Sequence, residues 1–162
     1  IFNAEKIDTH GGSLRIYVKK NKTKIHLNVK KILKEEERFG LKHYKTYQAF
    51  EKKINSIKKK VVNKIHELKN NNNKIVGYGS PAKATTTLNY FGISDEIDCI
   101  VEDNKFKQGK FLPGMKIPII AKENLKEKPD YMVVLAWNFF KEIKSKNASL
   151  ADKFLSIKDL EK

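Results

Sequence analysis

Cysteine is nearly absent from this chain of 162 residues, in which Cys99 is the only one. A single cysteine cannot form a disulfide within the chain, and it excludes a zinc site built from cysteines alone. His26, His43 and His66 have no metal-ligand spacing to one another or to Cys99. We therefore expect no metal site within this sequence.

Long apolar runs are missing as well. No stretch approaches the ~18 apolar residues that a membrane-spanning helix needs, and the first residues lack the basic and then apolar order of a signal peptide. We expect a soluble, cytoplasmic protein without membrane contact. With 40% hydrophobic and 33% charged residues, the chain can bury a globular core. Because residue 1 is Ile rather than Met, we expect it to be a piece of a longer protein.

Arginine is scarce although the chain is strongly basic. The formal net charge is +15, and Arg15 and Arg38 are the only arginines among 34 basic residues. Planar, bidentate recognition of phosphate or guanine favours arginine, and aromatic residues are not interleaved with the lysines as a base-stacking surface requires. A dedicated nucleic-acid binder is therefore disfavoured, and we interpret the lysines as a solvated surface.

The first half predicts a strand followed by helices. Residues 13–18 alternate apolar and polar side chains, which is typical of a half-buried strand. Residues 30–38 are rich in helix formers, and Gly40 is placed to end that helix. A longer amphipathic helix follows, because apolar residues then recur every three or four positions. Its apolar stripe consists of Tyr47, Phe50, Ile54, Ile57, Val61, Ile65 and Leu68.

The second half alternates strands with helices. The predicted strands are residues 75–79, 97–101, 117–120 and 131–136. The predicted helices between and after them are residues 82–91, 121–127 and 138–146. This alternation is typical of an α/β fold with a Rossmann-like parallel sheet and flanking helices. We expect residues 74–162 to form that unit, and residues 1–73 to pack on it or to bridge to chain outside this sequence.

A glycine-rich turn lies between the first of these strands and its helix. The segment Gly77-Tyr78-Gly79-Ser80-Pro81-Ala82 fits the pattern G-x-G-x-x-A. Gly77 allows a tight turn, Gly79 lets a diphosphate approach the backbone, and amides at the helix start face the anion. Lys83 adds a positive charge. A purely structural turn of small residues would fit the same pattern, and methyl donors and nicotinamides use related loops.

Further candidates follow the neighbouring strands. The carboxyl ends of parallel strands meet at one edge, so the glycine turn, the residues after position 101 and those after position 136 should converge. The acidic residues Glu102 and Asp103 there lie near the spacing expected of a ribose-hydroxyl partner. Trp137 either stacks on a ligand or packs at a helix entry with Asn138 as the cap. The candidates at this edge are Gly77, Gly79, Ser80, Lys83, Asp103, Asn104, Trp137 and Asn138.

A second cluster precedes the first strand. His10-Gly11-Gly12-Ser13-Leu14-Arg15 combines an imidazole, a hydroxyl and one of the two arginines. Arg15 could clamp a phosphate or a carboxylate, and His10 could relay a proton near neutral pH. A solvated turn before a strand explains the same residues without a ligand.

Four motifs in order resemble the C-terminal domain of the sugar C-methyltransferase family. The resemblance extends from His10 to Asn138, and Ala84 stands where many relatives carry glycine. The motifs are His10–Arg15, Gly77–Lys83 with Asn89-Tyr90, Lys107–Lys110 with Pro113-Gly114 and Ile117–Ile119, and Trp137-Asn138.

The resemblance implies a three-part enzyme, of which this chain is the last part. Relatives have an N-terminal zinc-binding region with a cysteine cluster, a middle domain that binds S-adenosylmethionine, and a Rossmann-like domain that helps to form the nucleotide-sugar site. The whole enzyme would transfer a methyl group from S-adenosylmethionine to a sugar carbon of a nucleotide-linked keto-sugar. The family's Tyr/Glu/His catalytic motif has no counterpart here, so we expect the fragment alone to be inactive.

The resemblance also implies a role for each candidate residue. Gly79, Ser80 and Lys83 would face the diphosphate. Asp103 or Asn104 would face the nucleoside. The region near the transferred group would be lined by His10, Ser13 and Arg15, with His10 as an auxiliary catalytic candidate.

Two other function classes stay open at this stage. The net charge would fit a free-standing, basic nucleotide- or nucleic-acid-binding Rossmann-like module without catalysis. A purely structural Rossmann unit, acting as a lid or a dimerisation wall, would also carry small residues in its first turn.

Overall fold

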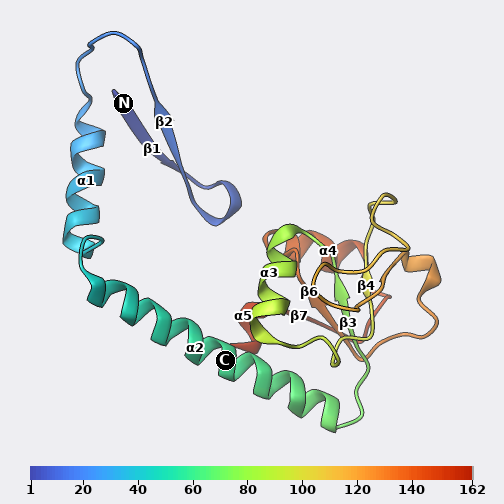
Figure 1. Ribbon diagram of the computed structural model, residues 1–162. Coiled ribbons are helices and arrows are strands. Elements are labelled where there is room, and N and C mark those ends of the chain that lie inside the picture. Colours follow the sequence, from blue (N-terminus) through green and yellow to red (C-terminus); the bar gives the residue numbers. More distant parts are fainter. Residues whose placement is uncertain (162) are drawn as a thin grey trace. The chain divides into compact units, whose positions relative to one another are not determined.

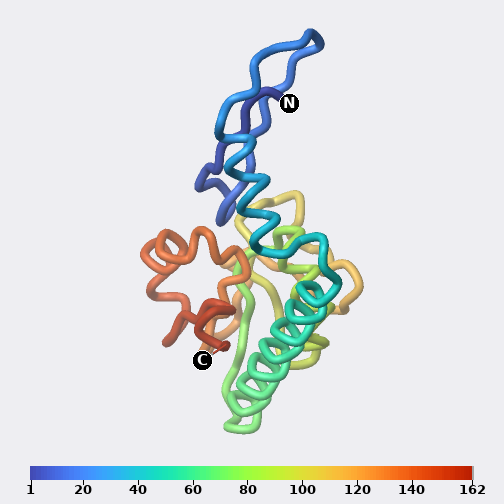
Figure 2. Tube along the Cα trace, turned by 90° about the vertical axis from the view of Figure 1, so that its left-hand side faces the viewer, coloured from blue at the N-terminus to red at the C-terminus, as the bar shows by residue number. Residues whose placement is uncertain are grey.

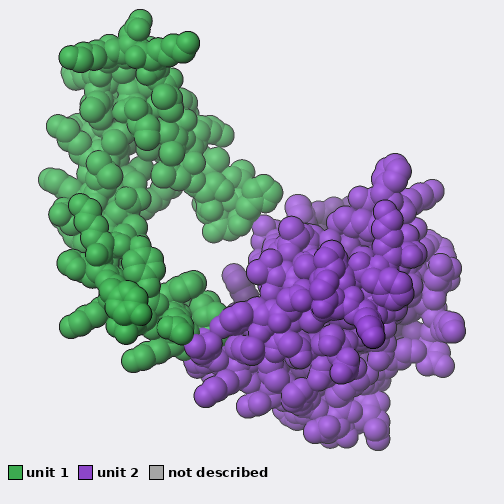
Figure 3. Space-filling model, in the orientation of Figure 1, with its two compact units in different colours: residues 1–54 green, residues 55–162 purple. Residues whose placement is uncertain are grey.

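The chain folds as two compact units. The computed structural model describes residues 1–161, and the units are Ile1–Ile54 and Asn55–Lys162 (Figure 3). Helix α2 (Tyr44–Asn70) carries the chain from the first unit into the second. The domain division expected after residue 73 stays a prediction. Because α2 is continuous across the boundary, the two units share a helix rather than a loop linker.

The first unit is a β-hairpin with one helix. Strand β1 (Asn3–Ile7) pairs antiparallel with β2 (Ser13–Tyr17) across a 3-10 turn at Thr9–Gly11. Helix α1 (Leu27–Phe39) runs beside the hairpin (Figure 2) and ends at Gly40, whose φ is 81°. The predicted strand is thus confirmed, and its partner is the segment just before it. That partner was not expected, because Asn, Ala, Glu and Lys are uncommon in strands.

The second unit is built on a five-stranded parallel sheet (Figure 1). Its strand order is β5-β4-β3-β6-β7, and every neighbouring pair is parallel. This confirms the α/β class and the Rossmann-like sheet. The chain adds two strands on one side of β3 and then two on the other, so the topological switch lies between β3 and β6. The strands are β3 (Ile75–Tyr78), β4 (Ile100–Val101), β5 (Ile119–Ile120), β6 (Tyr131–Val134) and β7 (Lys153–Ser156).

Helices cover both faces of this sheet. Side chains alternate along β6, so that Val133 belongs to one apolar core and Met132 to another. The C-terminal half of α2 joins the first core together with α3 (Ala82–Phe91) and α5 (Ile157–Leu160). Helix α4 (Phe140–Lys146) packs on the second core. A parallel sheet is stable in this form because neither face meets water.

Several predicted elements differ from those observed. The helix expected at 121–127 is only a 3-10 turn at Lys122–Asn124, because a helix of so few residues gains few backbone hydrogen bonds for the cost of its first turn. The strands expected at 97–101 and 117–120 shorten to two residues each. Strand β7 and helix α5 were not expected. The four residues of β7 contain no strong alternation, so only their pairing with β6 identifies them.

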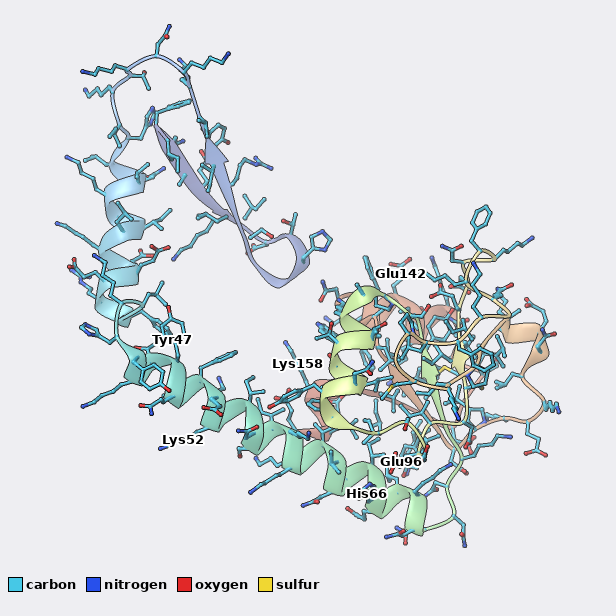
Figure 4. All side chains as sticks on the ribbon, viewed as in Figure 1. Tyr47, Lys52, His66, Glu96, Glu142 and Lys158 are labelled. Carbon is cyan, nitrogen blue, oxygen red and sulfur yellow. The ribbon has the colours of Figure 1, made fainter. Side chains whose placement is uncertain are left out.

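The apolar stripe of α2 is buried over half of its length. Val61 and Ile65 are fully buried, whereas Tyr47 is 51% and Phe50 is 63% exposed. A hydrogen bond from His66 to Glu96, 2.9 Å long, ties the buried half to the loop after α3; both residues are labelled in Figure 4. None of the helices within residues 1–161 has both the length and the hydropathy to cross a bilayer.

The two halves of α2 should respond differently to truncation. We expect Ile65→Ala to lower the free energy of unfolding by about 2–5 kcal/mol, because it leaves a cavity in the first core. Phe50→Ala should cost less than about 0.5 kcal/mol, because an exposed side chain loses few contacts. Urea denaturation of both variants measures these costs. Equal losses would show that the exposed half of the stripe is also buried in solution.

Candidate functional site

A cavity of about 360 Å³ opens where β3, β4 and β6 end. Gly79 and Ser80 line it from the loop after β3, Asp103 from the end of β4, and Ala136 from the segment after β6. Helix α4 adds a further wall, which includes Glu142. The cavity therefore lies at the topological switch, which is where open parallel sheets bind their ligands.

Both glycines of the turn are closely packed. A Cβ on Gly77 would lie 3.1 Å from side-chain carbons of Ile100 and Leu135. Gly79 has a φ of +83°, and a Cβ there would lie 3.1 Å from that of Ala136. Glycine alone combines the left-handed backbone with this close approach. The sheet explains the two glycines even before any ligand is considered.

The turn is anchored to the end of β4 by a carboxylate. Ser80 donates two hydrogen bonds to Glu102 Oε2, from its backbone N–H at 2.8 Å and from its hydroxyl at 2.6 Å. The other oxygen of Glu102 accepts the N–H of Asn104 at 3.0 Å. Lys107 donates to the carbonyl of Ser80 at 2.9 Å and lies 3.6 Å from Glu102. Both hydrogen-bond donors of Ser80 are therefore already engaged within the protein.

This network controls the ionisation of Glu102. Burial by itself raises the pKa of the Glu102 carboxyl, but hydrogen bonds from Ser80 and Asn104 and the charge of Lys107 lower it more, and the resulting pKa lies below its usual value. The side chain is 12% exposed. A carboxylate that is ionised and largely buried needs these donors, so the glycine turn and the loop after β4 hold each other in place.

Tyr78 and Asp103 form a second polar pair in the cavity. The Tyr78 hydroxyl donates to Asp103 Oδ2 at 2.8 Å. Burial, together with this carboxylate, raises the pKa of Tyr78 to about 12. The phenol therefore stays protonated near neutral pH and remains a donor to Asp103. The second acidic residue after β4 is thus also engaged within the protein.

Lys83 lies over the only tryptophan. Its ammonium is 4.4 Å from the centre of the Trp137 ring, a favourable cation–π distance. Burial lowers the pKa of Lys83. Trp137 is partly buried against the first core, which is the packing role considered for it. Asn138 is not the cap of the following helix, because it lies within a 3-10 turn (Trp137–Phe139) and Phe139 precedes α4.

A second hollow of about 580 Å³ lies between α3 and the loop 106–113. Ala82 and Thr85 line it from α3, and Lys107 and Lys110 from the loop, without any carboxylate among its lining residues. Phe106, also in the lining, is 86% exposed. By contrast, lysines and carboxylates are mixed in the first cavity, where Lys146 is 2.6 Å from Glu142 on α4.

The second cluster of the sequence lies on the hairpin. His10 is in the turn with a φ of 55°, an uncommon value for a residue with a side chain. The Ser13 hydroxyl donates to the carbonyl of Thr9 at 3.0 Å. Arg15 is exposed on β2, opposite Glu5 of β1. These three candidates belong to the first unit, and the others belong to the second.

The structure brings some of the predicted site residues together. Gly79, Ser80 and Asp103 line the first cavity, whereas Gly77 is buried inside β3. Four candidates lie outside the lining of that cavity, on α3 and in the segments after β4 and β6: Lys83, Asn104, Trp137 and Asn138.

Some residues of the cavity were not predicted. Tyr78 and Lys107 stand inside motifs that had been singled out, so proximity to those motifs could have identified them. Glu142, Lys146 and Asn147 come from α4 or just after it and carry no motif. Within residues 1–161, no three His, Cys, Asp or Glu side chains are arranged to hold a metal ion.

Comparisons with known proteins relate this chain to C-methyltransferases. A family model described as the C-methyltransferase C-terminal domain matches residues 8–155. The C-methyltransferase NovU of Streptomyces niveus is 29% identical over 147 residues, which cover 88% of this chain and 35% of NovU. The chain therefore spans about a third of the length of the curated relative that it matches.

The anchoring role of Glu102 has a signature in the pH dependence of stability. Because its folded pKa is lowered, its contribution is complete above the ordinary pKa of 4.5 and is lost as the pH falls through the folded value. At pH 7 we expect Glu102→Gln to cost about 1–3 kcal/mol, since hydrogen bonds to a charge are lost. Urea denaturation between pH 7 and pH 3 should show this cost shrinking below pH 4.5.

Glu123→Gln, at an exposed position of the turn after β5, is the matched control and should leave stability unchanged. A cost of Glu102→Gln that stays constant over the same pH range would contradict the anchoring role.

Proposed function

The chain belongs to the C-methyltransferase C-terminal domain family, and from this premise we propose that it is the nucleotide-sugar-binding part of a larger S-adenosylmethionine-dependent C-methyltransferase. The supporting observation is the cavity at the topological switch, which adjoins the first turn of α3. Parallel α/β sheets bind nucleotides at this place, because helix N-termini present N–H groups and a partial positive charge.

The diphosphate would lie at the start of α3. No side chain caps this helix, whose N-cap is Pro81, so its first amides are available to an anion. Lys83 lies in this first turn, and Lys107 and Lys110 line the hollow between α3 and the facing loop, so three positive charges are near it. Gly79 would let the diphosphate approach the backbone. Ser80 would meet it only in competition with Glu102, which accepts both of its donors.

The nucleoside would extend toward the end of β4. Asp103 and Asn104 follow that strand, and Asp103 lines the cavity. A carboxylate at this position suits a ribose hydroxyl. Trp137 and Asn138 follow β6 at the same edge and would border the ligand. Gly77 would contribute indirectly, through the close packing that shapes the turn.

The proposed reaction forms a carbon–carbon bond on a nucleotide-linked keto-sugar. A base would remove the proton from the carbon next to the carbonyl, and the resulting enolate would attack the methyl carbon while its bond to sulfur breaks, which leaves the neutral thioether S-adenosylhomocysteine. S-adenosylmethionine supplies that methyl group on a positively charged sulfur. His10, Ser13 and Arg15 would lie near the transferred group, with Arg15 available to balance negative charge and His10 available as an auxiliary proton carrier.

We place S-adenosylmethionine, and also the zinc implied by the family resemblance, in parts of the protein that precede this chain. The fragment alone would then be inactive, because the residues that abstract the proton would also lie there. We place the whole enzyme in the cytoplasm.

Binding of nucleoside diphosphates to the full-length protein tests the proposal. We expect Lys83→Ala to weaken the binding of dTDP or UDP about tenfold, because one charge-assisted contact to phosphate is lost. Isothermal titration calorimetry in the presence of S-adenosylmethionine measures the change. Lys126→Ala removes an exposed lysine from the loop before β6 and should leave the affinity unchanged.

Two results would refute this assignment. Affinity for dTDP and UDP that is the same in the Lys83→Ala variant would mean that this lysine does not meet phosphate. Tight binding of an RNA 20-mer at physiological salt, without affinity for either diphosphate, would favour the basic nucleic-acid-binding module, whose support is the net charge of +15.

A further inference from the structure

The hairpin of the first unit exposes a row of apolar side chains. Leu14, Ile16 and Val18 alternate along and just after β2, so they point to the same side of the hairpin. They are 43%, 48% and 68% exposed. Ala4 is the only buried apolar residue among residues 1–54. The hairpin therefore has almost no core of its own.

Helix α1 covers only part of this side. It packs against β1, where Lys6 pairs with Glu35. Between the hairpin and α1 a hollow of about 560 Å³ remains, and its lining includes Leu14, Ile32 and Phe39. Apolar walls around an unfilled space are a site where further apolar side chains would fit.

The hairpin also has free edges. It is a sheet of two strands, so each strand has one edge without a partner strand. Two-stranded hairpins are marginal by themselves, and an open edge with apolar residues is a place where another strand pairs. In the second unit, by contrast, β3, β4 and β6 each have a neighbour on both sides.

The family comparison suggests which part of the protein would cover the apolar row and pair with the free edge of the hairpin. The match to the C-terminal domain model begins at residue 8, just after β1 ends at Ile7. Strand β1 therefore lies outside the matched residues, whereas β2 lies within them. The curated relative is also much longer than this chain, which covers 35% of it.

We propose that the hairpin completes a sheet belonging to the part of the full-length protein that precedes residue 1. A strand of that part would pair with the free edge of β2, and apolar side chains of the same part would cover Leu14, Ile16 and Val18. The turn that carries His10 would then be held at the border of that sheet. The inference rests on the proposed function only in requiring a larger protein, and it needs no particular substrate.

Hydroxyl-radical footprinting of the full-length protein tests this inference without any variant. Oxidation of Leu14 and Ile16 is compared with that of Leu27 and Leu33 on α1, which are 79% and 58% exposed. Each rate is normalised to the urea-unfolded protein. We expect the rates at Leu14 and Ile16 to be about fivefold lower than those at the α1 positions, as for side chains that are nearly fully buried. Equal normalised rates would overturn the proposal.

A matched pair of variants adds a second readout. In the full-length protein, Ile16→Lys should speed hydrogen–deuterium exchange in residues 13–18 about a hundredfold, because a buried, unpaired charge opens the contact. Leu33→Lys makes the same change on α1 and should leave that exchange as it is. Unchanged exchange in both variants would contradict the pairing, and if Ile16→Lys fails to fold, footprinting of the unmodified protein still decides.

Neither measurement uses a nucleotide or methyl transfer. A negative result in these two experiments would therefore not refute the proposed diphosphate site. Conversely, failure of diphosphate binding would not refute the docking of the hairpin.

Discussion

The close approach of β3 to β4 and β6 is the constraint on which the second unit depends. Gly77 lies between side chains of Ile100 and Leu135, and Gly79 lies against Ala136 in a left-handed conformation. A Cβ at either glycine would lie 3.1 Å from these neighbours, so their side chains would have to shift, and at Gly79 the backbone would also be strained. Because the three strands are parallel and adjacent, they end at one edge, and the cavity opens there. The same small residues that allow the sheet to pack therefore also shape the candidate site.

The site is organised before any ligand arrives. Glu102 accepts both donors of Ser80, and Tyr78 donates to Asp103, so the polar groups of the glycine turn and of the β4 end already satisfy one another. This preorganisation holds the loop in shape at low entropic cost. In the proposed function, an anion would therefore be recognised by the first turn of α3 and the lysines near it rather than by Ser80. The proposed function thus depends less on Ser80 than the glycine pattern alone implied.

The two units differ in how far they bury their apolar residues. The second unit has a core on each face of its sheet, with Ile75 in one and Val76 in the other. The hairpin of the first unit leaves the apolar side of β2 half exposed. Helix α2 carries the same contrast within one element, since its stripe is buried at Ile65 and exposed at Phe50. An amphipathic pattern predicts that one face of an element is apolar and favours burial. Whether other residues of this chain bury that face depends on the tertiary structure.

The sequence by itself determined the local elements and the class of the fold. The alternation of strands and helices after residue 74, the glycine turn and the helix stop at Gly40 depend on neighbouring residues, so they were predictable from spacing and propensity. Tertiary structure decided what depends on distant residues. Only the pairing with β6 makes a strand of Lys153–Ser156, only the folded loops join Ser80 to Glu102, and only the packing of α4 brings Glu142 to the cavity. These contacts join segments that are far apart in the chain. The local sequence cannot predict which distant residue completes a hydrogen bond or covers an apolar face.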